Sequence, residues 1–144
     1  TLVDARTGFY SRNGTIRRLR ELGAAAERFG RPIACVVISA DGEATAAKLD
    51  SETIDQVARL LRGETRKSDV LGRIGPRDFA VVAPDTPPEG AEKLAARIRE
   101  RTGEGPGTRT GVYGLEDLTG VEFNPFELVT RATQASKQPP PHRN

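Results

Sequence analysis

The chain has 144 residues, of which 36% are hydrophobic and 29% are charged. This length and composition fit one water-soluble domain with a sizeable core, and no apolar run approaches the ~18 residues of a membrane span. The 22 basic residues are interleaved with 20 acidic ones, and the formal net charge is only +2, which excludes the broad positive field of a typical nucleic-acid-binding protein.

The first half of the chain predicts a helix, a strand and a second helix. Apolar residues at helical spacing predict a helix over Asn13–Phe29, which Gly30 ends. The run Ile33–Ile38 is rich in β-branched residues and predicts a strand buried on both faces in the middle of a sheet. It contains Cys35, the only cysteine, which we expect to be a small buried hydrophobe. Apolar spacing then predicts a helix over Ser51–Glu64.

The middle of the chain predicts a hairpin followed by a helix. Two short β-type runs, Asp69–Ile74 and Phe79–Ala83, are joined by the turn Gly75-Pro76-Arg77-Asp78. The segment Thr86-Pro87-Pro88-Glu89 predicts the start of a third helix, with Thr86 as its N-cap.

The last part of the chain predicts one more strand, over Thr108–Tyr113, and a helix that begins after Asn124. The Pro-rich segment 138–144 predicts an extended tail after a domain over residues 1–137. The resulting order α-β-α-β-β-α-β-α predicts an α+β fold of the ferredoxin-like, palm type, with a mainly antiparallel sheet and flanking helices. We expect these helices to cover one face of the sheet.

Three separate motifs of the chain match those of one known domain family. The segment Asp4–Arg12 keeps the Asp, Thr, Gly and Arg of a D-x-L-T-G-L-x-N-R motif. Arg66-Lys67-Ser68-Asp69 matches R-x-x-D, and Gly75–Phe79 follows after five residues, where the family has G-G-(D/E)-E-F. Ala95–Arg99 matches the family's A-x-R-I-R helix. The pattern resembles the GGDEF domain, the diguanylate cyclase fold that condenses two GTP molecules into cyclic di-GMP, and the resemblance runs from Asp4 to about Lys137.

The resemblance also shows where the signature turn has changed. Gly75 is retained, but Pro76 replaces the second glycine, Arg77 the metal-binding acid and Asp78 the glutamate. A proline fixes φ and removes an N–H donor, so Pro76 is expected to spoil the backbone's approach to phosphate. An arginine offers only donors and a positive charge, so Arg77 is expected to repel Mg²⁺.

A further metal-binding aspartate of the family aligns with Ser39, a neutral and weaker ligand, while Asp41 survives at the following acidic position. The segment that helps bind guanine in the family is shorter here and lacks its asparagine, so binding of GTP is doubtful. We therefore expect no catalytic residue, no bound metal and no cofactor. Residual enzyme activity, with Asp41 and Asp78 in place of the lost ligands, is the least favoured alternative.

The R-x-x-D motif implies an inhibitory-type site for cyclic di-GMP, made by Arg66 and Asp69 and completed by Arg97 from the third helix. An arginine can bind phosphate or the O6/N7 edge of guanine bidentately, and a carboxylate can accept from guanine N1–H and N2–H. The alternative is a solvated turn with a surface ion pair, because R-x-x-D is common by chance in a chain this rich in Arg and Asp.

Two hypotheses of function follow. The first is a catalytically inactive domain that binds cyclic di-GMP and regulates a linked sensor or effector domain, or a partner. The second is a ligand-free scaffold for homodimerisation or docking. The chain has no Met and opens without a signal-peptide pattern, so we expect a cytoplasmic domain of a larger protein, which could be membrane-attached, with no membrane insertion by this part. Scattered aromatic residues give no stacking platform for nucleic acid.

Overall fold

The computed structural model describes residues 2–40, 51–102, 108–114 and 125–136. The elements are, in chain order, α1 (Arg12–Phe29), β1 (Ile33–Ala40), α2 (Ser51–Glu64), β2 (Val70–Arg73), β3 (Asp78–Pro84), α3 (Pro88–Thr102), β4 (Thr108–Gly114) and α4 (Pro125–Ser136). The predicted order of helices and strands is confirmed, and most boundaries differ from it by one or two residues.

The four strands form one sheet in the order β2-β3-β1-β4, and every pairing in it is antiparallel. The hairpin β2-β3 places β3 beside β1, so β1 and β2 belong to a split β-α-β unit with β3 between them. The central position predicted for Ile33–Ile38 is confirmed, since β1 pairs with β3 on one side and β4 on the other. The expected ferredoxin-like α+β fold is therefore present.

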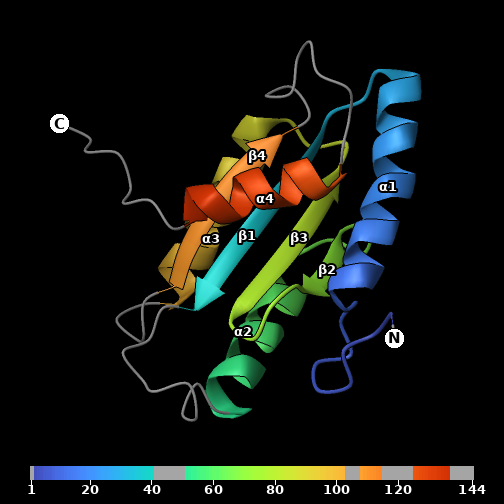
Figure 1. Ribbon diagram of the computed structural model, residues 1–144. Coiled ribbons are helices and arrows are strands. Elements are labelled where there is room, and N and C mark those ends of the chain that lie inside the picture. Colours follow the sequence, from blue (N-terminus) through green and yellow to red (C-terminus); the bar gives the residue numbers. More distant parts are fainter. Residues whose placement is uncertain (1, 41–50, 103–107, 115–124, 137–144) are drawn as a thin grey trace, which may run out of the picture.

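The helices cover both faces of the sheet, so the expectation of a single covered face is wrong. Alternate residues of β1 point to opposite faces. Val36 and Ile38 pack in one cluster with residues of α2 and α3, whereas Cys35 and Val37 pack in the other with residues of α1 and α4. Figure 1 shows α4 crossing in front of the sheet and α3 behind it. An uninterrupted apolar strand needs cover on both faces because every one of its side chains must leave water.

Helix α1 has well-formed ends. The hydroxyl of Ser11 accepts a hydrogen bond from the N–H of Gly14 at 3.2 Å, which satisfies one of the unpaired donors of the first turn. Gly30 adopts the left-handed conformation with φ 64°, and the N–H of Arg31 reaches back to the carbonyl of Ala26 at 2.8 Å. Among the described residues, no helix is long and apolar enough to cross a membrane.

Candidate ligand groove and signature hairpin

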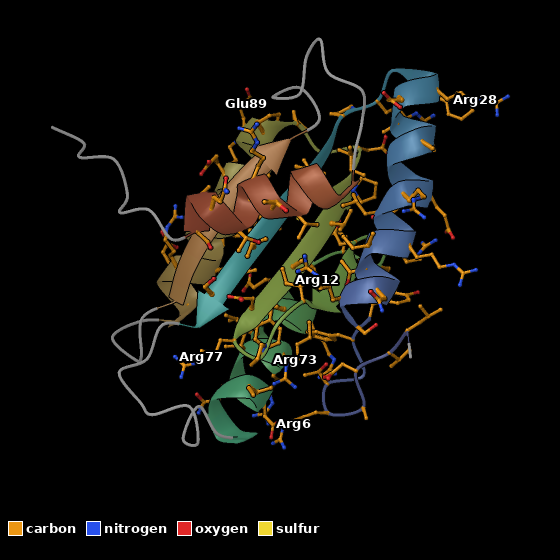
Figure 2. All side chains as sticks on the ribbon, viewed as in Figure 1. Arg6, Arg12, Arg28, Arg73, Arg77 and Glu89 are labelled. Carbon is orange, nitrogen blue, oxygen red and sulfur yellow. The ribbon has the colours of Figure 1, made fainter. Side chains whose placement is uncertain are left out.

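The hairpin between β2 and β3, which we call the signature hairpin (residues 74–78), is held closed by its own backbone. The N–H of Ile74 donates to the carbonyl of Asp78 at 2.9 Å, and the N–H of Asp78 donates to the carbonyl of Gly75 at 3.4 Å. Pro76 suits the second position of such a turn because its φ is fixed. Figure 2 shows Arg77 beside this tip, directed away from the sheet.

The register of β1 and β3 places Ser39 opposite Asp78. The hydroxyl of Ser39 donates to Oδ1 of Asp78 at 2.7 Å and lies 3.1 Å from the hydroxyl of Ser136 in α4. Ser136 in turn donates to the carbonyl of Thr133 at 2.6 Å and is fully buried. These residues form a short hydrogen-bonded chain between the sheet and α4, on the face that α1 and α4 cover.

This arrangement does not suit the Mg²⁺ ions that the resemblance implies. Ser39 and Asp78 supply one carboxylate between them, and that carboxylate is hydrogen-bonded to Ser39. Arg77 contributes a positive charge where a hard cation needs oxygen ligands. Within the described residues, no group of three or more His, Cys, Asp or Glu side chains is placed to hold a metal ion. Asp41 lies outside the described residues.

The N-terminal turn is tied to the signature hairpin through Arg73. Asp4 accepts hydrogen bonds from the N–H of Thr7 at 3.0 Å and from its hydroxyl at 2.7 Å. Arg73 Nη1 lies 3.5 Å from Asp4, while its Nη2 donates to the carbonyl of Pro76 at 3.1 Å. Burial acts to raise the pKa of Asp4, but the Thr7 hydrogen bonds and the charge of Arg73 outweigh it, so this pKa lies below its ordinary value.

A groove of about 340 Å³, which we call the RxxD groove, brings together the three residues proposed for cyclic di-GMP. It lies where the end of α2, the turn after β3 and the first turns of α3 meet. Among its lining residues are Arg66, Asp69 and Arg97, together with Glu64, Thr86 and Lys93. The cations and acids are interleaved along this groove.

Arg66 is anchored through one nitrogen. Its Nη2 donates to Oδ1 of Asp69 at 3.2 Å, to the carbonyl of Pro84 at 3.1 Å and to the hydroxyl of Thr86 at 2.7 Å. Asp69 also accepts from the backbone N–H of Arg66 at 2.9 Å. The side chain of Asp69 is only 3% exposed, whereas that of Arg66 is 57% exposed. Asp69 thus orients Arg66, and the rest of the Arg66 guanidinium faces solvent.

Arg97 reaches the same groove from α3, as its spacing predicts. Its Nε lies 3.4 Å from Oε2 of Glu64, and Nε of Arg101 lies 3.2 Å from Oε1 of the same carboxylate. The side chain of Arg97 is 51% exposed while that of Glu64 is 16% exposed. Glu64 therefore fixes Arg97 at the rim as Asp69 fixes Arg66, and both guanidinium groups keep an exposed part.

The sequence did not point to Glu64 or Lys93 as part of this groove, and it assigned Thr86 a different role. The predicted N-cap at Thr86 is wrong, because its hydroxyl donates to the carbonyl of Pro84 at 3.0 Å and accepts from Arg66. The first helical acceptor of α3 is instead the carbonyl of Pro87, which receives the N–H groups of Gly90 and Ala91. The available signal was a threonine two residues after β3, the second strand of the hairpin that follows R-x-x-D.

Comparison with known proteins gives one family match. Residues 49–108 match the family described as "Diguanylate cyclase, GGDEF domain". The matched range includes α2, the R-x-x-D turn, the signature hairpin and α3. A search of curated proteins finds no match.

Solved structures give the same fold over nearly the whole chain. The GGDEF domain of FimX from Pseudomonas aeruginosa superposes with a TM-score of 0.81 at 19% identity, covering 94% of this chain and 91% of that one. A sensory box/GGDEF family protein from Caulobacter crescentus gives a TM-score of 0.79 at 23% identity, with 94% and 95% covered.

A third similar structure, the GGDEF domain of DgcB from Caulobacter crescentus, was solved in complex with c-di-GMP. It gives a TM-score of 0.80 at 16% identity, covering 94% of this chain and 85% of that one. At these identities the structures establish the fold. The family match covers residues 49–108, and the structures show that nearly the whole chain has the fold of GGDEF domains.

Proposed function

We propose that this GGDEF-like domain is catalytically silent and binds cyclic di-GMP in the RxxD groove, through Arg66, Asp69 and Arg97. The observation that carries the proposal is the convergence of these residues, from a turn and from α3, on one groove of about 340 Å³. Occupancy of this groove then regulates a linked domain or a partner protein.

The chemistry of the groove suits a ligand that carries both guanine and phosphate. Arg66, Lys93 and Arg97 can donate to phosphate oxygens or to the O6/N7 edge of guanine. Glu64 and Asp85 line the same groove and can accept from guanine N1–H and N2–H. Purely cationic grooves bind any polyanion, so the interleaved acids favour a ligand with donors as well as negative charge.

We expect no catalytic activity because the signature hairpin lacks the set of carboxylates that would hold metal ions. A GTP-condensing site must neutralise triphosphates and activate a hydroxyl, which metal ions do in enzymes of this chemistry. The Ser39 hydroxyl is hydrogen-bonded to the Asp78 carboxylate. The neighbouring Arg77 adds a positive charge, which disfavours a metal ion there. Incubation with GTP and either Mg²⁺ or Mn²⁺ is expected to yield no cyclic di-GMP by chromatography, and product at any steady rate would contradict this part of the proposal.

Binding is tested by calorimetric titration with cyclic di-GMP. Arg66→Ala is expected to weaken binding by roughly 10- to 150-fold, because a charge-assisted pair is worth roughly 1.5–3 kcal/mol. Arg59→Ala is the matched control, since Arg59 is an exposed arginine on α2 that does not line the groove. Equal affinity in the two variants would show that the ligand binds elsewhere.

The scaffold alternative has less support from the described surface. Its exposed large hydrophobic residues are Leu2, Val3 and Phe29. Leu2 and Val3 precede α1 and Phe29 ends it, so about 27 Å of helix separates them. They do not form one apolar patch of the kind that marks an interface. A flat titration with cyclic di-GMP, combined with self-association in sedimentation, would favour the scaffold instead.

A further inference from the structure

A second groove, of about 440 Å³, lies on the other side of the R-x-x-D turn. We call it the Arg62 groove. Its lining comes from the N-terminal turn (Gly8, Phe9 and Tyr10), from α1 (Arg18), from α2 (Arg62) and from residues 67–71. Asp69 lines both grooves. Nothing in the family resemblance or the proposed function assigns a role to this second groove.

Three basic side chains from separate elements line the Arg62 groove: Arg18, Arg62 and Lys67. Among the described residues that line the groove, Asp69 is the only acid, and its side chain is 3% exposed and hydrogen-bonded to Arg66. The charge of Asp69 is therefore already compensated on the far side of the turn. Arg18 is paired with Glu21, so among the described residues Arg62 and Lys67 are the lining cations that form no ion pair. Because basic side chains outnumber acids in the described lining, we expect a positive field in the groove.

The cations of the groove are partly preorganised. The guanidinium of Arg62 donates to the carbonyl of Thr7 and lies 4.9 Å from the ring centroid of Phe9. Both contacts fix its position without neutralising its charge. Phe9 is itself buried, and it packs edge-on against Phe79 at 6.3 Å. The floor beneath Arg62 is therefore part of the core.

Arg18 has an unmet donor. Its Nε is buried and has no hydrogen-bond partner among the described residues. Its Nη1 lies 2.7 Å from Glu21, in an ion pair whose side chains are 37% and 54% exposed. Such exposed pairs contribute little free energy, whereas a buried donor without a partner is costly. An oxyanion in the groove would offer acceptors for the remaining donors of Arg18.

We propose that the Arg62 groove is an anion site for a small phosphate-bearing molecule, held by Arg18, Arg62 and Lys67. A phosphate group has several acceptor oxygens in a tetrahedral arrangement, so it can receive donors that converge from three directions. The volume of the groove lies within the range of small-molecule sites. This proposal does not rest on cyclic di-GMP binding in the RxxD groove, although Asp69 lines both grooves.

The test uses inorganic pyrophosphate as the probe, followed by ¹H–¹⁵N amide spectra of the whole chain at constant ionic strength. Saturable shifts are expected at Gly8, Ser68 and Leu71. Lys67→Gln and Arg18→Gln are each expected to weaken binding at least about tenfold, which corresponds to about 1.4 kcal/mol. Arg62 is left intact because it also holds the N-terminal turn.

Arg20→Gln is the matched control, because Arg20 is an exposed arginine on α1 that lines neither groove. It removes the same charge and is expected to leave binding unchanged. The proposal is overturned if the wild type shows no saturable shift up to about 10 mM pyrophosphate. It is equally overturned if Lys67→Gln binds like Arg20→Gln, or if the shifts centre on Thr86 and Gly90 in the RxxD groove.

Discussion

The hydroxyl of Ser39 donates to Oδ1 of Asp78 at 2.7 Å, across two adjacent antiparallel strands. Ser39 stands where the GGDEF resemblance implies a metal-binding aspartate, and Asp78 stands where it implies a glutamate. The pair has become a structural contact, and Ser136 extends it into α4. The signature hairpin is therefore tied to β1 and α4 through Ser39, which stands where the resemblance implies a metal ligand.

Replacement of Ser39 by alanine is expected to destabilise the fold. The change leaves the Asp78 carboxylate without its hydroxyl donor and removes a partner of the buried Ser136, which together should lower the free energy of unfolding by about 1–3 kcal/mol. Urea denaturation measures this difference. Ser68→Ala, at an exposed position, is the control. A Ser39→Ala variant as stable as the control would show that the hydrogen-bonded chain contributes nothing.

Carboxylates placed around Asp78 should create affinity for a divalent metal ion. The double variant Ser39→Asp, Arg77→Glu supplies oxygen ligands and removes a positive charge, so Mn²⁺ should raise its melting temperature in a saturable manner. The wild type should show no such rise. A saturable increase in the wild type would mean that it already holds a metal and would undermine the proposal of a silent site.

The hydrogen bonds that Asp4 accepts from Thr7, together with its contact with Arg73, predict a defined pH dependence of stability. Because the pKa of Asp4 is lowered in the folded state, its charge stabilises the fold above the unfolded value of about 3.8, and this contribution disappears as pH falls through the folded pKa. Asp4→Asn should therefore lower stability at pH 7 by about 1–2 kcal/mol. The difference from wild type should shrink in denaturation curves below about pH 4. A difference that stays constant down to pH 2 would contradict this account.

Gly72 in β2 is required by its contact with α1. A Cβ at this position would lie 1.9 Å from the hydroxyl oxygen of Thr15, which is fully buried and donates to the carbonyl of Ser11. Gly72→Ala should lower the free energy of unfolding by about 1–3 kcal/mol, because helix and sheet must move apart. Thr15→Ala in the same chain should relieve part of the added cost, because it removes the hydroxyl and methyl groups but keeps the Thr15 Cβ, which lies 2.9 Å from the added Cβ. Additive effects in this double-mutant cycle would show that the two residues do not interact.

The fold could be predicted largely from local patterns, because they reflect local physical constraints. The run Ile33–Ile38 is apolar without interruption, which placed β1 in the middle of the sheet. The same run implied cover on both faces, and the expectation of one covered face failed because it came from the element order alone. Thr86 was misassigned as an N-cap because its position before Pro87 fits that pattern, whereas its true partners lie in β3 and the R-x-x-D turn.

The candidate site could be predicted only where a motif marks it. Arg66 and Asp69 follow from R-x-x-D and its distance to the signature hairpin, and Arg97 follows from its spacing after Phe79. Glu64 and Lys93 belong to no recognised motif, and they reach the groove only because α2 and α3 pack together in the folded chain. Similarly, Ser39 and Ser136 are 97 residues apart, and only the packing of α4 on the sheet brings their hydroxyls together.

The most direct test of the central claim is a titration of the ¹⁵N-labelled chain with cyclic di-GMP, followed by backbone amide shifts. Binding of cyclic di-GMP in the RxxD groove predicts saturable amide shifts at Asp69, Thr86 and Gly90. Arg66→Ala is expected to abolish these shifts, and Arg59→Ala is expected to leave them in place. Absence of saturable shifts, or shifts confined to Gly75–Asp78 in the signature hairpin, would contradict it.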